Sequence, residues 1–292
     1  MTLEERTIDN LVMEAIQEKC ILNTTEKIEY PPIALSMGEK RFTTKDGVKT
    51  YPIPIGTYGN FSFVQAPPKT KKTFFVSLLA SVYLADSNKF GGDLKGHRDD
   101  KCLLHFDTEQ GKWHCQKVFR RVLDMNDTKE DKNYHTFTLR TIGYKTRLEF
   151  IEYWLREKVE EGKAGLVIID GVADLISDVN NLEESNSVVQ KLMEWTAKYN
   201  CHIVTIIHSN YGSSKPTGHL GSLLEKKAET QIELEKNTVH HEHITVRCRR
   251  SRGFPFDSFS FKVNDYGYPI IVGNLYDHLQ GLDIKHKEIP FD

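Results

Sequence analysis

From Tyr51 onward, short runs of consecutive apolar residues alternate with longer amphipathic stretches. Consecutive apolar residues indicate strands that are covered on both faces, and amphipathic stretches indicate the helices that cover them. The expected strands are Phe61–Ala66, Cys102–Asp107, His135–Leu139, Gly165–Ile169 and His202–Ile207, with helices Lys72–Leu84, Lys112–Leu123, Lys145–Glu161 and Leu182–Tyr199 between them. The pattern predicts an α/β fold with a mostly parallel sheet flanked by helices.

The pattern changes after Leu220, where apolar and polar residues alternate and short turns such as Asp265-Tyr-Gly intervene. This alternation is typical of strands with one solvated face, joined as hairpins. The segments concerned are Thr230–Leu234, Thr238–Arg247, Phe256–Val263 and Tyr268–Val272. We therefore expect a C-terminal antiparallel β extension of the sheet.

The chain before Tyr51 has a different texture. Leu3–Ile21 has helical apolar spacing, and a Pro31-Pro32 break and a polar stretch from Gly38 to Lys49, expected to be a loop, follow it. The last residues are polar and are expected to be peripheral. Three regions are predicted: a peripheral N-terminal helical segment (1–50), a core (51–273) and a C-terminal tail (274–292).

Composition limits the class of protein. The 292 residues are 39% hydrophobic and 27% charged, as in globular proteins, and the net charge of −2 gives no general attraction to nucleic acid. The N-terminus has no signal-peptide pattern, and the longest apolar run, around Phe74–Leu84, is about half a membrane span. The five cysteines form no CxxC pair. We expect a cytoplasmic protein with reduced thiols and no membrane contact.

A basic loop separates the first core strand from its helix. It contains Pro68, Lys69, Thr70, Lys71, Lys72, Thr73 and Phe74. A Lys-Thr pair at a helix start after a strand is typical of phosphate loops, where the lysine meets the β/γ-phosphates and the hydroxyl meets Mg²⁺. The alternative interpretation is a basic turn that only starts a helix.

Neither glycine of the GxxxxGK[ST] pattern is present, because Ala66 and Lys71 occupy those positions. Alanine can replace the first glycine if its φ is negative. Lysine can replace the second only if that position avoids a positive φ. The loop therefore leaves both nucleotide binding and turnover open.

Three further strands end in polar side chains. Glu109 follows Cys102–Asp107, Asp170 follows Gly165–Ile169, and His208 follows His202–Ile207. Ligands of α/β sheets bind at the carboxyl ends of the strands, so these side chains should face the basic loop. Asp170 would orient the water shell of a metal, Glu109 would orient or deprotonate an attacking water, and His208 would sense the γ-phosphate. The alternatives are helix caps, a solvated glutamate and an ordinary surface histidine.

Four arginines, Arg247, Arg249, Arg250 and Arg252, cluster at the end of a late expected strand. Guanidinium groups suit phosphate oxygens. They would contact nucleic acid or the nucleotide of a neighbouring subunit, or they are simply a solvated basic strand end.

In this order and spacing, the lysine–threonine loop, the Asp107-Thr-Glu, Ile168-Ile-Asp and His208-Ser-Asn strand ends, a Gly-His-Leu-Gly-Ser segment and the Arg-rich strand end resemble the RecA-like P-loop ATPase core. Within that class the chain looks most like the RepA-like, DnaB-related proteins of plasmids and mobile elements, over Tyr51–Val272. The resemblance implies ATP and Mg²⁺ as cofactors. It assigns phosphate contact to Lys72 and Thr73, catalysis to Glu109, metal orientation to Asp170 and γ-phosphate sensing to His208.

The same resemblance implies partners. Arg250 and Arg252 match the Lys-x-Arg pair that reaches across a subunit interface in DnaB-like relatives, which implies a homo-oligomer, with a hexamer as one form. The loop within Ser209–Ser222 would contact DNA, preferably single-stranded, and its expected contact residues are Asn210, Lys215 and His219.

Two functional hypotheses follow. The first is an ATP-hydrolysing, helicase- or loader-like ring motor acting on DNA in replication or mobilisation of a mobile element, and the retained Glu109, Asp170 and arginine pair favour it. The second is a RecA-fold DNA-binding or assembly factor with little hydrolysis, favoured by the missing glycines. A metabolic P-loop kinase is a weaker third, because no segment resembles a substrate lid.

Overall fold

The computed structural model describes residues 3–45, 47–85, 93–210 and 215–272, so the predicted C-terminal tail lies outside the described residues. Contacts divide the chain into two units, Met1–Pro31 and Pro32–Asp292. The first unit holds helix α1 (Leu3–Cys20), where the sequence predicts a helix. None of the described helices has the length and apolarity needed to cross a membrane.

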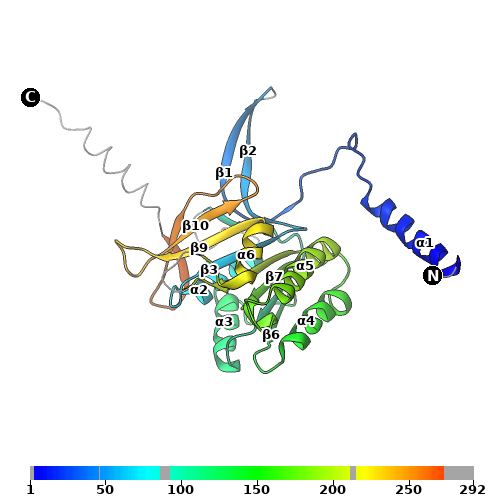
Figure 1. The fold of residues 1–292 in the computed structure, drawn as a ribbon. Coiled ribbons are helices and arrows are strands. Elements are labelled where there is room, and N and C mark those ends of the chain that lie inside the picture. The colour runs from blue at the N-terminus through cyan, green and yellow to red at the C-terminus, as the bar shows by residue number, and fades with distance from the viewer. Residues whose placement is uncertain (1–2, 46, 86–92, 211–214, 273–292) are drawn as a thin grey trace, which may run out of the picture. The chain divides into compact units, whose positions relative to one another are not determined.

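The second unit contains the predicted alternation of strands and helices (Figure 1). Its helices are α2 (Lys72–Ala85), α3 (Lys112–Asp124), α4 (Tyr144–Tyr153) with the π-helical turn η1 (Trp154–Lys158), the 3-10 turn η2 (Val172–Leu175), α5 (Leu182–Tyr199) and α6 (Gly218–Lys227). Its strands are β1 (Ile33–Thr44), β2 (Gly47–Thr57), β3 (Phe61–Ala66), β4 (Leu94–Gly96), β5 (Cys102–Asp107), β6 (Tyr134–Thr138), β7 (Ala164–Asp170), β8 (His202–His208), β9 (Thr230–Lys236), β10 (Ile244–Ser251), β11 (Phe259–Val263) and β12 (Pro269–Val272).

Nine strands form the main sheet in the order β12-β11-β10-β9-β3-β8-β7-β5-β6. The strands from β9 to β6 are parallel. Their carboxyl ends are nearly level, because Ala66 pairs with His208, Asp170 with Ile206, and Asp107 with Asp170. The prediction of a mostly parallel sheet is confirmed, and its register puts the polar strand ends at one edge.

The antiparallel extension is also present but begins one strand later than predicted. Strand β9 pairs in parallel with β3, and the antiparallel pairs of this sheet are β9 with β10, β10 with β11 and β11 with β12. The predicted strand start at Thr238 is wrong. The Asn237 side chain accepts hydrogen bonds from the backbone N–H groups of Val239 and His240, which makes a turn there.

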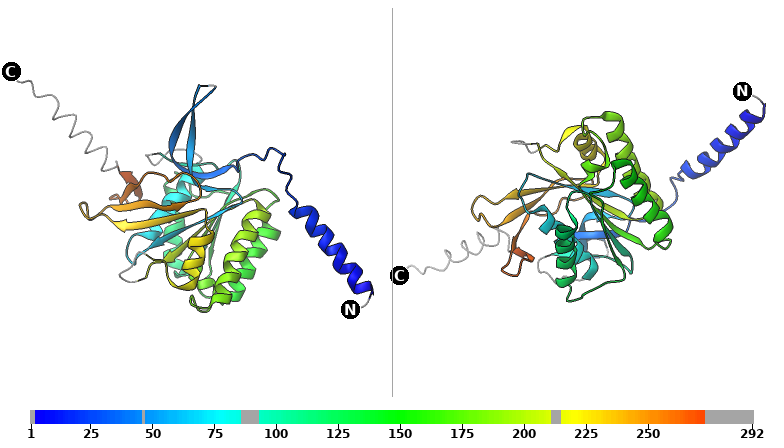
Figure 2. Two further views of the ribbon diagram at one scale, coloured as in Figure 1. Left: turned by 45° about the horizontal axis from the view of Figure 1, so that its top comes forward. Right: turned by 90° about the horizontal axis from the view of Figure 1, so that it is seen from below.

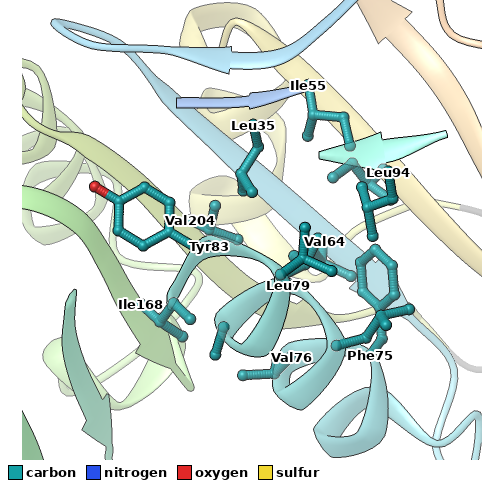
Figure 3. Close-up of a cluster of buried hydrophobic side chains, with 14 of the residues drawn as sticks. Leu35, Ile55, Val64, Phe75, Val76, Leu79, Tyr83, Leu94, Ile168 and Val204 are labelled. Carbon is teal, nitrogen blue, oxygen red and sulfur yellow. The ribbon is translucent and has the colours of Figure 1, made fainter. Parts of the chain in front are cut away.

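Helices cover both faces of the main sheet (Figure 2). Buried side chains of α2 and α3 belong to the core on one face, and those of α4, α5 and α6 belong to the core on the other. Helix α2 is apolar nearly all round, as expected of a helix buried on all sides. It lies between the main sheet, which contributes Val64 and Val204, and a small sheet of β2, β1 and β4, which contributes Leu35 (Figure 3).

The polar stretch Gly38–Lys49, predicted to be a loop, instead forms most of the distal half of a β hairpin formed by β1 and β2. The base of the hairpin is anchored in the core by buried Leu35 and Ile55. Its distal half is mostly exposed, so neither face needs to be apolar. The sequence there lacks the alternation of polar and apolar residues by which strands are predicted. Backbone pairing from Glu39 to Thr44 holds this half together.

Candidate functional site

The basic loop after β3 adopts left-handed backbone conformations without glycine. Lys69 has φ +63° and Lys71 has φ +55°, whereas Ala66 keeps a negative φ. A left-handed conformation costs a non-glycine residue about 1–2 kcal/mol. The condition for alanine at the first glycine position is met. The condition for lysine at the second glycine position, a φ that is not positive, is not met. The backbone at Lys71 is therefore strained.

Two hydrogen bonds help to hold this loop. The Thr70 hydroxyl donates to the Pro67 carbonyl at 2.7 Å, and the Lys71 ammonium donates to the Glu242 carbonyl, in the β9–β10 connection, at 3.0 Å. The loop then enters α2, whose first N–H groups and positive dipole end face the same edge. Backbone, dipole and lysines thus form a site suited to an anion.

Side chains from three other strand ends gather beside α2. The Lys72 Nζ atom lies 2.8 Å from both ring nitrogens of His208. His208 Nε2 in turn lies 3.5 Å from a carboxylate oxygen of Glu109. The structure therefore brings Lys72, Glu109 and His208 into one cluster, as the sequence predicts for their positions.

Asp170 adds a buried acid to this cluster. Burial, together with the neighbouring carboxylates of Asp107 and Glu109, raises the pKa of Asp170 to about 7. Burial also lowers the pKa of Lys72, against the opposing effect of Glu109 and Asp170. The hydrogen bond with His208, and then the charge of Lys72, lower the pKa of Glu109. Crowded acids with one buried lysine make a site where a further cation is stabilised.

The donor set fits Mg²⁺ only with help from a ligand. Among the described residues, no group of three or more His, Cys, Asp or Glu side chains is placed to hold a metal by itself. Mg²⁺ is commonly bound by one or two carboxylates together with substrate phosphates. Asp170, and Thr73 on the first turn of α2, suit that arrangement when phosphate oxygens complete it.

Sequence reasoning missed the residues that fix the loops after β5 and β7. The Thr108 hydroxyl lies 2.9 Å from the carbonyl oxygens of Asp170 and Gly171 and from a carboxylate oxygen of Asp174. Arg147 donates to the Asp174 carbonyl at 2.7 Å. These contacts tie the backbone that carries Glu109 to the backbone that carries Asp170.

Gly171 is the residue in the sequence that could have indicated this close contact between the loops after β5 and β7. Its φ is +108°, and a Cβ atom there would lie 2.2 Å from the Thr108 hydroxyl oxygen. The alternative in which Asp107 or Thr108 caps the helix that begins at Lys112 is not observed: Asp107 accepts the N–H groups of Glu109 and Gln110, and Gly111 precedes α3 without a side-chain cap. Asp107 therefore shapes the turn on which Glu109 stands.

The structure does not bring Arg250 and Arg252 to this cluster. Strand β10 runs antiparallel to β9, and the Arg252 N–H donates to the Glu229 carbonyl, whose own residue pairs with Phe61 at the start of β3. The pair therefore lies at the end of the sheet opposite Lys72. Arg250 is exposed, and an Arg252 guanidinium nitrogen donates to the Lys227 carbonyl at 2.7 Å. Arg247 and Arg249 form ion pairs with Glu235 and Glu233.

The predicted DNA-contact residues flank a segment, 211–214, that lies outside the described residues. The Asn210 N–H donates to the Lys215 carbonyl at 2.9 Å, which brings the two ends of the segment together. His219 is exposed on α6. Thr217 donates its N–H and its hydroxyl to the His208 carbonyl, so this region is joined directly to the cluster.

Comparisons with known proteins agree with this architecture. A family model described as AAA domain matches residues 55–214. The crystal structure of the RadB recombinase aligns with a TM-score of 0.51 and 16% identity, covering 74% of this chain and 92% of that one. At this identity the likeness concerns the fold, which is RecA-like. Comparison with curated proteins gives no match.

Proposed function

Because the chain belongs to the AAA domain family and has a RecA-like fold, we propose that it binds ATP with Mg²⁺ and hydrolyses it while acting on DNA. The observation that carries this proposal is the convergence of Lys72, Glu109 and His208, with buried Asp170, at the carboxyl edge of the parallel strands. These contacts support the proposed roles of Glu109 and His208 over those of a solvated glutamate and an ordinary surface histidine.

In the proposed site, the loop Pro68–Phe74 and the N-terminus of α2 hold the phosphates, with Lys72 on the β/γ-phosphates. Thr73 and Asp170 hold Mg²⁺, which would neutralise phosphate charge. Glu109 orients the attacking water. His208 senses the γ-phosphate and passes its state to the loop through Thr217.

The finer proposal is a cytoplasmic, helicase- or loader-like motor of the RepA-like, DnaB-related type, serving a mobile element. It would work as a homo-oligomer, with a hexamer as one form, in which Arg250 and Arg252 reach the nucleotide of a neighbour. Asn210, Lys215 and His219 would contact single-stranded DNA. The position of the arginine pair, at the opposite end of the sheet from its own Lys72, supports action on a neighbouring subunit.

One observation favours the second hypothesis, a DNA-binding or assembly factor with little hydrolysis. Lys69 and Lys71 occupy left-handed conformations in a loop that usually relies on glycine for them. This hypothesis keeps the fold and the oligomer but not the turnover.

The test is the thermal stability of the protein with and without Mg·ATP. At ligand concentrations of one hundred times Kd, mass action stabilises the folded state by about 2.7 kcal/mol. Lys72→Ala should lose this effect, whereas Lys117→Ala, an exposed lysine on α3, should keep it. A wild-type protein without any shift in millimolar ATP would refute nucleotide binding. A shift without phosphate release, in the presence of DNA, would select the second hypothesis.

A further inference from the structure

One face of the β1–β2 hairpin collects aromatic and cationic side chains. Lys40 pairs with Tyr51 and Phe42 pairs with Lys49 across the hairpin, so the four residues share a face. Phe254, from the segment after β10, packs on the same face. We call these five residues the aromatic platform. Its four hairpin residues belong to the distal half of the β1–β2 hairpin, and this hairpin extends away from the main sheet (Figure 1).

The rings of the platform contact one another edge-on or at a tilt and remain accessible. Phe42 lies 5.3 Å from Phe254 and 5.8 Å from Tyr51, centroid to centroid, and Lys40 Nζ lies 3.8 Å above the Phe254 ring. Tyr51 and Phe254 are still 49% and 47% exposed. A cluster of exposed aromatic rings has a free-energy cost in a monomer and marks a binding surface.

The charge around these rings is positive. Residues 39–51 include four cations, Lys40, Arg41, Lys45 and Lys49, against two acids, Glu39 and Asp46, in a chain whose net charge is −2. Lys95 neutralises Glu39 at 3.0 Å. The hairpin is thus a local positive patch of the kind that a nearly neutral protein needs in order to attract nucleic acid.

We propose that the aromatic platform binds single-stranded nucleic acid, whose bases stack on Tyr51 and Phe254 while the hairpin cations contact phosphates. Stacking on aromatic side chains beside basic residues is the general chemistry of sequence-independent single-strand binding. Lys40 and Lys45 alone are roughly 17 Å apart along a strand, more than one mononucleotide can span. A protein partner fits less well, because lysine is depleted from the centres of protein interfaces, whereas here Lys40 covers a central ring.

The inference deepens the proposed function, since it adds a second contact surface for the same class of partner. The platform shares the end of the sheet that holds Arg250 and Arg252, away from Lys72 and from the loop around Asn210. Its binding should therefore need no nucleotide. That independence allows the two proposals to fail separately.

The experiment measures the fluorescence anisotropy of a labelled oligo-dT with the full chain, without ATP. Tyr51→Ala and Phe254→Ala should each weaken binding by about tenfold, the range found when one stacking side chain is removed. Tyr51→Trp should restore it. Tyr266→Ala is the matched control, because Tyr266 is 83% exposed but lies in the β11–β12 turn. Circular dichroism melts verify that each variant is folded.

Unchanged oligo-dT affinity in both alanine variants would overturn the proposal. So would a loss of self-association in sedimentation velocity with DNA binding intact, which would make the platform a contact between copies. If the wild type shows no thermal shift with ATP, the proposed ATPase fails while this binding test remains valid.

Discussion

At the scale of single residues, Glu109 is placed to act as a carboxylate. The hydrogen bond with His208 and the charge of Lys72 hold its pKa below the usual value, so it is ionised at neutral pH. In the proposed site, an ionised acid beside the basic loop can orient a water and accept its proton. Glu109→Gln keeps the size and removes the charge. We expect nucleotide binding to persist while hydrolysis falls on the order of a hundredfold or more.

Steady-state phosphate release and nucleotide-dependent melting measure the two effects. Glu149→Gln, a matched change at an exposed position of α4, should alter neither. Equal turnover in Glu109→Gln and the wild type would return Glu109 to the role of a solvated side chain.

The buried imidazole of His105 leads to a prediction about the stability of the protein at acid pH, separate from the function of the basic loop. Burial lowers the pKa of this imidazole from 6.5 to about 3. The folded state therefore keeps it neutral, whereas the unfolded chain binds a proton below pH 6.5. The contribution to stability is complete above pH 6.5 and is lost as the pH falls from there toward 3, by about 1.4 kcal/mol per pH unit.

His105→Gln removes this proton uptake. The stability of the wild type relative to His105→Gln should fall by about 2 kcal/mol between pH 7.5 and pH 5.0, measured by urea unfolding at each pH. His114→Gln serves as the control, because it makes the same substitution at an exposed histidine of α3. A constant gap between His105→Gln and the wild type would show that the His105 imidazole is not held neutral by burial.

The sequence predicts the positions of Lys72, Glu109, Asp170 and His208 because each stands at the end of an apolar strand, and parallel strands end at one edge. Their catalytic roles stay predictions. Thr108 and Arg147 were not predicted, since they act through contacts with backbone carbonyls that no residue pattern records. The left-handed Lys71 was not predicted either, because local propensity argues against it and only the packed loop imposes it.

At the scale of elements, the buried helix α2 depends on close contact with β4. A Cβ atom at Gly96 would lie 2.5 Å from the Val82 carbonyl oxygen and 2.6 Å from the Tyr83 Cα. Both are backbone atoms and cannot turn aside. Gly96→Ala should therefore push the small sheet from α2 and lower the free energy of unfolding by about 1–3 kcal/mol.

Chemical denaturation measures this change. Gly143→Ala is the control, since Gly143 has φ −65° and no atom within 4 Å of its Cβ position. It should change stability by no more than about 0.5 kcal/mol. Equal stability of Gly96→Ala and the wild type would show that β4 moves freely over α2.

The strands and helices of the core are predicted within one or two residues where apolar runs are long and buried, as for β3, β5 and α5. The prediction fails where pairing, and not burial, makes the strand. The distal half of the β1–β2 hairpin carries polar residues on both faces. Polar and apolar residues alternate along β9 as in an antiparallel strand, yet β9 pairs in parallel with β3. Its direction depends on a partner strand that is far away in sequence.

At the scale of the whole molecule, the arginine pair and Lys72 lie at opposite ends of the sheet. If Arg252 completes the site of a neighbour, an equal mixture of inactive Lys72→Ala and Arg252→Ala should regain part of the ATPase activity. Some interfaces would then join an intact loop to an intact arginine. The arginine effect itself should be about a thousandfold or more on turnover, with binding kept.

Phosphate release by the mixture, at concentrations where light scattering shows assembly, measures this recovery. A mixture as inactive as its parts would contradict action between subunits. A protein that stays monomeric with ATP and DNA would do the same. The control mixes the single variant Lys72→Ala with a double variant that carries both Lys72→Ala and Arg252→Ala. No interface in that mixture holds an intact loop, so it should stay inactive.

Because the arginine pair and the basic loop lie at opposite ends of the sheet, the activity per subunit can reveal how the copies assemble. In a two-fold dimer, the arginine pair of each copy can meet the loop of the other and both sites are complete, whereas a head-to-tail contact completes one site per interface. In an open assembly of head-to-tail copies, the subunit at one end keeps an incomplete site. The fraction of inactive subunits therefore falls as the assembly grows longer. A closed assembly has no idle copy. Activity per subunit that rises with length would therefore identify an open assembly, and a constant value at one defined size would identify a closed one.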